Sequence, residues 1–130
     1  MNEGDVLGIV VAHGTMAEGL VSAVRKIAGG AADGLYALSN DGKNTDELRT
    51  ELNRLAGDSR AVVFVDLQAG SCNAVALSCC RDATHRAVLC GVNLPVLLDF
   101  VFHRDRPLDE IVDRLVEKGR SSIATVTPKT

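Results

Sequence analysis

The chain has 130 residues, of which 46% are hydrophobic, with 14 basic and 17 acidic side chains. This length suffices for one domain whose buried core needs no disulfide or metal to support it, so we expect a single domain over residues 1–130. The slightly acidic balance, together with no Trp and one Tyr, disfavours binding to nucleic acid through charge or base stacking.

The most apolar segment, near residues 92–102, contains Asn93, Pro95 and Asp99 and falls short of a membrane span. The first residues, MNEGD, lack the positive charge of a secretion signal. We therefore expect a cytoplasmic protein with no direct membrane insertion, in which thiols stay reduced.

The four cysteines, at positions 72, 79, 80 and 90, have no CxxC spacing. We expect them to be buried as small apolar side chains rather than to bind zinc with His85 or His103. These two histidines have charged neighbours in the sequence, which predicts solvated side chains.

The first half of the chain alternates aliphatic runs with helical patterns. Residues 6–12 (VLGIVVA) form a run typical of a parallel strand buried on both faces. A Thr15–Glu18 capping box predicts a helix that ends at Gly29, and a short strand follows over 35–38. Asn44 with Glu47 predicts the start of a second helix, which ends at Gly57. The apolar positions expected to face the core are Met16, Leu20, Val24, Ile27, Leu48, Leu52 and Leu55.

The second half repeats this alternation. Residues 61–67 (AVVFVDL) predict a third strand with Asp66 near its end, and Ser71 or Asn73 can cap a helix that runs to about residue 81. The remaining elements expected are a strand over 86–92, a helix from Pro95 to about residue 103, a helix from Pro107 to Gly119, and an edge strand over the alternating residues 122–127 (SIATVT).

Strands and helices that alternate at this spacing predict an α/β fold. We expect a doubly wound, mostly parallel sheet with helices on both faces and residues 122–127 as a C-terminal edge strand. In such a sheet, functional residues gather outside the carboxyl ends of the strands, where the strand order reverses. Four polar residues follow strands at that edge: His13, Asp66, Ser71 and Asn93.

If the first and third strands are neighbours, Asp66 faces His13. A carboxylate that accepts the proton of one ring nitrogen fixes the tautomer and leaves the lone pair of the other nitrogen free to attack. Nearby, Gly14 and the Gly70–Ser71 turn open two helices whose free N–H groups can bind a phosphoryl group. His13 is thus a candidate nucleophile and Asp66 its orienting partner, with Gly14, Gly70 and Ser71 as candidate phosphate-binding residues.

Other interpretations stay open at this point. A His-Gly pair at a strand end is also an ordinary turn, and aspartate and serine there are also common caps. A receiver-like module that accepts phosphate on Asp66 needs further carboxylates after the first strand, where the sequence has Val11-Ala12-His13. A hydrolase that uses Ser71, His13 and Asp66 lacks the GxSxG turn.

Three longer segments carry more information: VVAHGTMAEGL at 10–20, FVDLQAGSCNAVA at 64–76 and GVNLPVLLDFV at 91–101. In this order and spacing they resemble the mannose-type IIA components of the bacterial phosphoenolpyruvate-dependent sugar phosphotransferase system. The resemblance implies that His13 accepts a phosphoryl group from the phosphocarrier HPr and passes it to a histidine of the EIIB component, while Asp66 bonds the other ring nitrogen. It also implies a homodimer that exchanges residues 122–127, and a reaction without cofactor or metal.

Three residues depart from the family pattern. Ala69 stands in place of a glycine, Leu67 in place of a hydroxyl residue and Cys72 in place of a proline. The resemblance leaves two alternatives open: a regulatory or signalling relative, and a phosphotransfer subunit for dihydroxyacetone phosphorylation.

Overall fold

The structure is a computed structural model that describes residues 4–68, 70–80 and 85–128. Its elements, in chain order, are β1 (Leu7–Ala12), α1 (Met16–Ala28), the 3-10 helix η1 (Gly29–Gly34), β2 (Leu35–Ser39), α2 (Thr45–Ala56), β3 (Ala61–Val65), α3 (Ser71–Ser78), β4 (Arg86–Cys90), α4 (Leu94–Val101) and α5 (Leu108–Ser121). None of the helices in these ranges is both long and apolar enough to cross a membrane.

The four strands form one parallel sheet in the order β2-β1-β3-β4. The chain builds outward from β1 to β2 on one side and then from β3 to β4 on the other, so the strand order reverses between β1 and β3. This is the doubly wound α/β arrangement predicted from the sequence, and it confirms that the first and third strands are neighbours.

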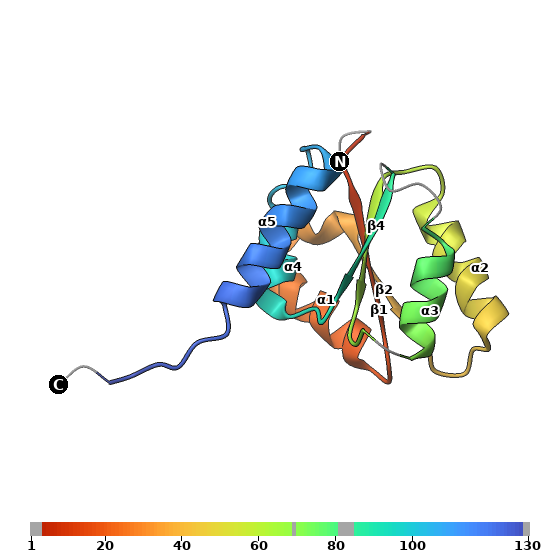
Figure 1. Cartoon of the computed structure of the whole chain (residues 1–130), viewed down its shortest axis with the longest axis horizontal. Coiled ribbons are helices and arrows are strands. Elements are labelled where there is room, and N and C mark those ends of the chain that lie inside the picture. The colour runs from red at the N-terminus through yellow and green to blue at the C-terminus, as the bar shows by residue number, and fades with distance from the viewer. Residues whose placement is uncertain (1–3, 69, 81–84, 129–130) are drawn as a thin grey trace.

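Helices cover both faces of the sheet (Figure 1). One apolar core lies between the sheet and α1, α4 and α5, and the other lies between the sheet and α2 and α3. In the first core, the rings of Phe64 on β3 and Phe100 on α4 pack edge to face, with their centroids 5.1 Å apart. Gly8 on β1 leaves room for this packing, because a Cβ there would lie only 2.5 Å from the Phe100 ring.

Two predicted helix starts differ from the structure. Thr15 precedes α1 but makes no side-chain cap hydrogen bond, and the residues that α1 buries are Ala17, Val21 and Val24. Met16 and Ile27, which were expected to face the core, are 41% and 64% exposed. The residue that caps α3 is Gly70, so neither Ser71 nor Asn73 fills that position. The predicted end of this helix near residue 81 lies outside the described residues.

The C-terminal region also differs. Helix α5 continues through Gly119 to Ser121. The glycine is there for packing, because a Cβ would lie 2.9 Å from the Val96 side chain on α4. Residues 123–127 of the predicted edge strand form no strand in the single chain and project away from its body (Figure 1).

The cap of α2 agrees with the sequence prediction and allows a matched test. The Asn44 side chain accepts a hydrogen bond from the Glu47 N–H at 2.8 Å, and the Glu47 side chain accepts one from the Asn44 N–H at 3.2 Å. We expect Asn44→Ala to lower the free energy of unfolding by about 1 kcal/mol. Thr15→Ala, which removes no cap bond, should change it by less than about 0.5 kcal/mol. Urea unfolding measures both, and equal losses would contradict this assignment.

Candidate functional site

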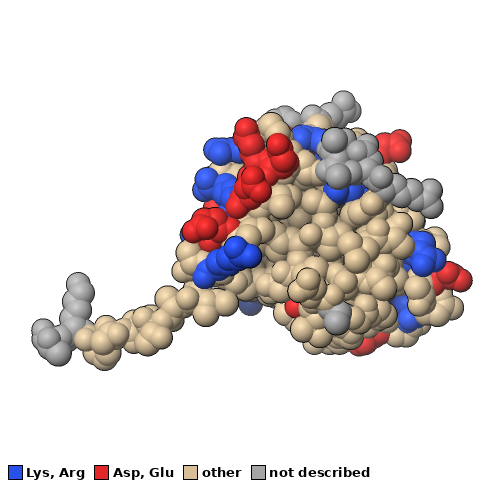
Figure 2. Space-filling view, viewed as in Figure 1, with Lys and Arg blue, Asp and Glu red and all other residues tan. Residues whose placement is uncertain are grey.

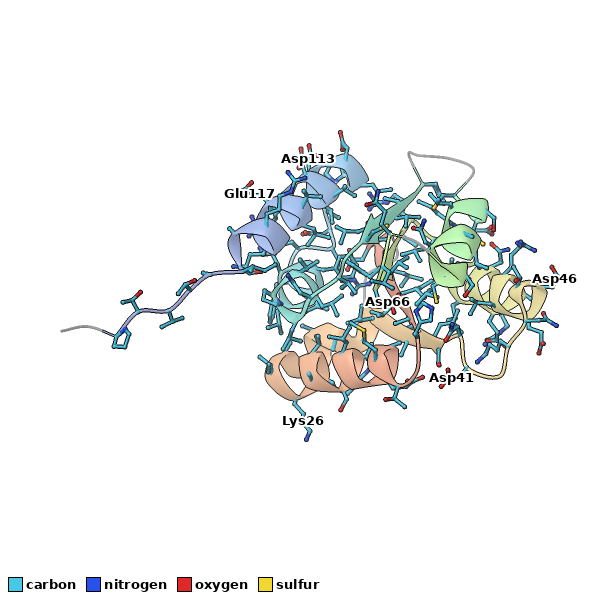
Figure 3. The ribbon with its side chains drawn as sticks, turned by 60° about the horizontal axis from the view of Figure 1, so that its bottom comes forward. Lys26, Asp41, Asp46, Asp66, Asp113 and Glu117 are labelled. Carbon is cyan, nitrogen blue, oxygen red and sulfur yellow. The ribbon has the colours of Figure 1, made fainter. Side chains whose placement is uncertain are left out.

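The candidate site lies where β1 and β3 end side by side. Val11 on β1 pairs with Val65 on β3, so the residues that follow these strands emerge next to each other at the carboxyl edge of the sheet. His13 follows β1 and Asp66 follows β3. Figure 3 shows Asp66 between α1 and α3, at the point where the strand order reverses.

A single carboxylate holds both the main chain and the ring of His13. Asp66 Oδ2 accepts a hydrogen bond from the His13 backbone N–H at 3.0 Å and lies 2.8 Å from His13 Nδ1. The other oxygen, Oδ1, accepts from the Leu67 N–H at 3.0 Å. An ionised carboxylate can only accept hydrogen bonds, so Nδ1 carries the proton of the neutral ring and the lone pair resides on Nε2.

The two side chains differ in their exposure to solvent. The Asp66 side chain is 8% exposed, whereas the His13 side chain is 45% exposed. Nε2 of His13 has no hydrogen-bond partner among the described residues. The site therefore has a buried orienting group and an accessible ring nitrogen, which is what a nucleophilic histidine requires.

Gly70 lies beside the accessible edge of the ring. Its φ of +105° favours glycine, and a Cβ there would lie 3.7 Å from His13 Cε1 and 3.8 Å from Nε2. Gly70 is also the residue from which α3 begins, and the first helical bond runs from the Ala74 N–H to the Gly70 carbonyl at 3.2 Å. The N–H groups before Ala74 lack a helical acceptor and form the positive end of the helix, close to Nε2.

Ser39 is a residue of this edge that sequence reasoning missed. It ends β2, where it pairs with Ala12. Its hydroxyl donates to the Gly14 carbonyl at 2.7 Å and accepts from the Asp41 N–H at 3.1 Å. Ser39 thus fixes the turn that follows His13. The one signal in the sequence is a hydroxyl residue at the end of a strand that neighbours the first.

Asn93 lies at the same edge but acts as a cap. Its Oδ1 accepts from the Val96 N–H at 3.1 Å at the start of α4. Its Nδ2 lies 3.4 Å from the Gly119 carbonyl and 3.3 Å from Ser122 Oγ, at the end of α5. These bonds tie two helices together, and none of them reaches His13.

The sequence matches a model of the EIIA-man family, described as "PTS system fructose IIA component", over residues 8–116. The chain belongs to this family. A search of curated protein sequences finds no significant match.

Solved structures of phosphotransferase-system IIA proteins resemble this EIIA-man chain over nearly its whole length. Component EIIA from Streptococcus agalactiae is 26% identical with a TM-score of 0.85, over 92% of this chain and 96% of that one. The mannose/sorbose specific IIA subunit from Enterococcus faecalis is 22% identical with a TM-score of 0.85, over 97% and 98%. The IIA protein associated with the fucose utilization operon of Streptococcus pneumoniae is 22% identical with a TM-score of 0.81, over 96% of each chain.

In this EIIA-man protein, the carboxyl of Asp66 has a pKa below its ordinary value. Burial acts to raise that pKa, but the hydrogen bonds from the backbone and ring of His13, the positive charge of the His13 ring when it is protonated and the bond from Leu67 together outweigh it. The folded state therefore favours the ionised carboxylate, which is the form that holds Nδ1–H.

This pKa shift predicts how Asp66 contributes to stability as the pH changes. Because its pKa is lowered on folding, Asp66 stabilises the fold above its ordinary pKa of 3.8 and loses that contribution as the pH falls through the lower, folded value. In urea unfolding of the wild type and Asp66→Asn, the difference in free energy should shrink below about pH 4. A difference that grows on acidification would contradict the prediction.

The cysteines and the other histidines differ partly from expectation. Cys72 and Cys79 are buried, but Cys80 and Cys90 are only half-buried. The two other histidines of the EIIA-man chain are not simply solvated, because each is partly buried and donates a hydrogen bond to a backbone carbonyl: His85 Nε2 to Asp58 at 2.6 Å and His103 Nδ1 to Asp99 at 2.7 Å.

Cys72, in the first turn of α3, adds a thiol to the candidate site. Its Sγ lies 4.0 Å from His13 Nδ1, on the side of the ring that faces Asp66. Burial, and next the charge of Asp66, raise the pKa of this thiol. The thiol therefore stays protonated near neutral pH and does not compete with Asp66 for the proton on Nδ1.

Proposed function

We propose that this protein is a phosphocarrier of the sugar phosphotransferase system, which accepts a phosphoryl group from phospho-HPr on His13 and passes it to a histidine of the EIIB component. The observation that supports this most directly is the double contact of Asp66 Oδ2 with the backbone and Nδ1 of His13. It leaves Nε2 as the nucleophilic atom on an accessible ring. The proposal treats residues 1–130 as one cytoplasmic domain.

In the proposed step, the lone pair of Nε2 attacks the phosphorus of phospho-HPr. The bond between phosphorus and the donor histidine breaks as the new bond to Nε2 forms. The proton on Nδ1 stays on that nitrogen, where it is hydrogen-bonded to Asp66. In the second transfer, phosphorylated His13 is the donor and the histidine of EIIB is the nucleophile. The protein thus supplies position and electrostatics rather than a cofactor.

The negative oxygens of the transferring group would lie near backbone donors. Gly70 flanks Nε2, and α3 begins directly after it with Ser71, so the N–H groups of this turn would serve as donors to the developing charge. Gly14 follows His13 in a turn with a φ of +59° that Ser39 holds. We propose Gly14, Gly70 and Ser71 as the phosphate-binding residues.

The test is a reconstituted transfer. The protein is incubated with radiolabelled phosphoenolpyruvate, enzyme I and HPr, and the label is then challenged with acid, with base and with the EIIB component of the same system. We expect a label that is labile to acid, stable to base and lost to EIIB. An acid-stable label, or none while HPr itself is labelled, would contradict the proposal. A label that forms but does not pass to EIIB would favour the regulatory alternative.

We also propose a homodimer in which residues 122–127 of one copy pair with the edge of β4 in another. β4 is the last strand of the sheet and pairs only with β3 among the described residues. Beside it lies a groove of about 260 Å³, lined by Val88, Val116 and Arg120 among others. Few charged side chains cover the middle of this face, whereas many gather over α5 (Figure 2).

The segment that would fill this edge is apolar and exposed in the single chain. Ile123 is 82% exposed and Val126 is 91% exposed. Deletion of residues 123–130 should therefore convert a dimer into a monomer with an intact fold, as measured by sedimentation equilibrium and circular dichroism. The substitution Val126→Asp should weaken the dimer in the same direction. A full-length monomer, or an equally stable dimer after the deletion, would contradict this arrangement.

A further inference from the structure

Cys72 completes a group of three different metal-ligating atoms. His13 follows β1, Asp66 follows β3 and Cys72 lies in the first turn of α3, and one ligand atom from each lies within 4.8 Å of the other two. It is the one such group found among the residues that the structure describes. A nitrogen, an oxygen and a sulfur donor together suit a borderline-soft divalent cation.

We propose that His13, Asp66 and Cys72 bind a Zn²⁺ ion that blocks phosphoryl acceptance by this protein. The inhibitory part of this proposal rests on the proposed function, whereas the binding part does not. The site would be regulatory, because the proposed transfer chemistry needs no metal. It depends on a cysteine at a position where the resemblance expects proline.

The present geometry is close to what such an ion requires. Zn²⁺ binds nitrogen at about 2.0 Å, oxygen at about 2.1 Å and sulfur at about 2.3 Å in a tetrahedral arrangement, which places pairs of ligand atoms about 3.3–3.7 Å apart. His13 Nδ1 lies 2.8 Å from Asp66 Oδ2 and 4.0 Å from Cys72 Sγ. The first distance must lengthen and the second must shorten to reach this range. A water molecule would complete the four ligands of the ion.

Binding at Nδ1 would remove the nucleophile. The metal takes the lone pair of Nδ1, so the proton formerly shared with Asp66 moves to Nε2, and the Cys72 thiol releases its proton to solvent as it becomes a thiolate. Nε2 then carries a hydrogen and has no lone pair for phosphorus. Two anionic ligands balance the charge of the ion, so the closed site is neutral.

Direct binding is tested with Co²⁺ and Zn²⁺ on the full chain. Co²⁺ bound to a thiolate gives a charge-transfer absorption in the near ultraviolet, and we expect one equivalent to produce it in the wild type and Zn²⁺ to remove it. Cys72→Ser should abolish the band and weaken Zn²⁺ binding at least about tenfold. Cys90→Ser is the matched control, because Cys90 contacts Asn73 rather than His13, and it should behave as the wild type.

The activity experiment compares the rate of phosphorylation by phospho-HPr in two samples, one with saturating Zn²⁺ added before the donor and one in which a chelator has removed the metal. We expect Zn²⁺ to reduce the rate at least about tenfold in the wild type and Cys90→Ser, and to leave Cys72→Ser unaffected. Cys72→Ala serves as a second variant if Cys72→Ser does not fold. Absence of the band, or a band that survives in both Cys72 variants, would overturn the site. Binding without inhibition would overturn the switch, and failure of phosphorylation without metal would instead overturn the proposed function.

Discussion

Replacement of His13 by Gln is expected to abolish labelling of the protein by phospho-HPr. A glutamine amide can still bond Asp66, but its nitrogen has no lone pair that can attack phosphorus. The loss should be complete within detection, whereas folding should persist because the side chain is 45% exposed. The measurement is the incorporation of radiolabel at saturating phospho-HPr, with circular dichroism to verify the fold.

The two other histidines provide matched controls for this substitution. His85 and His103 each donate to a backbone carbonyl, and neither follows β1 or β3. His85→Gln and His103→Gln should therefore accept label at the rate of the wild type. Label that survives in His13→Gln, or that disappears in one of the control variants, would place the acceptor elsewhere in the chain.

Asp66→Asn should slow phosphorylation by one or more orders of magnitude while the fold persists. An asparagine amide can donate a hydrogen bond to Nδ1, which stabilises the tautomer with its proton on Nε2 and so occupies the nucleophilic lone pair. The analogous substitution in the serine protease triad lowers the rate by about 10⁴. Single-turnover rates with phospho-HPr measure the effect, and affinity for HPr should change little.

A second pair of histidine and aspartate provides a control that separates the positioning of His13 by Asp66 from a general effect of negative charge on the rate. Asp99 lies 3.6 Å from His103 and also bonds Arg114 through both oxygens, at 2.8 and 3.1 Å. Asp99→Asn removes one negative charge, as Asp66→Asn does, but it does not touch His13. It should retain the wild-type rate. Equal rates in Asp66→Asn and the wild type would remove Asp66 from the mechanism.

The two predicted helix caps, at Asn44 and Thr15, show why one prediction from sequence was right and the other was wrong. Asn44 has extended backbone angles, with φ −80° and ψ 174°, as a cap residue needs. Thr15 stands three residues before Glu18, as Asn44 stands three residues before Glu47, but its φ of −97° and ψ of 11° are not extended. The turn before α1 is held by Asp66, which follows β3, and by Ser39, which ends β2. Local sequence cannot report such distant constraints.

The candidate site was predictable where it depended on strand order and unpredictable where it depended on local turns. Neighbouring ends of the first and third strands follow from the alternation of elements, so His13 and Asp66 could be paired before the structure was known. The position of Gly70 beside Nε2 and the hydroxyl bond of Ser39 depend on backbone angles and side-chain rotamers that no spacing specifies. Gly119 was misjudged for a similar reason, because contact with Val96 explains the glycine better than a helix end does.

The inward edge of the His13 imidazole is occupied by Asp66 and bordered by Cys72, so incoming proteins can reach this group from one direction only. Under the proposed function, phospho-HPr and the EIIB component then bind to the same surface around His13 and cannot be bound at the same time. The steady-state kinetics should accordingly be of the ping-pong type, with each unphosphorylated partner acting as a competitive inhibitor of the other.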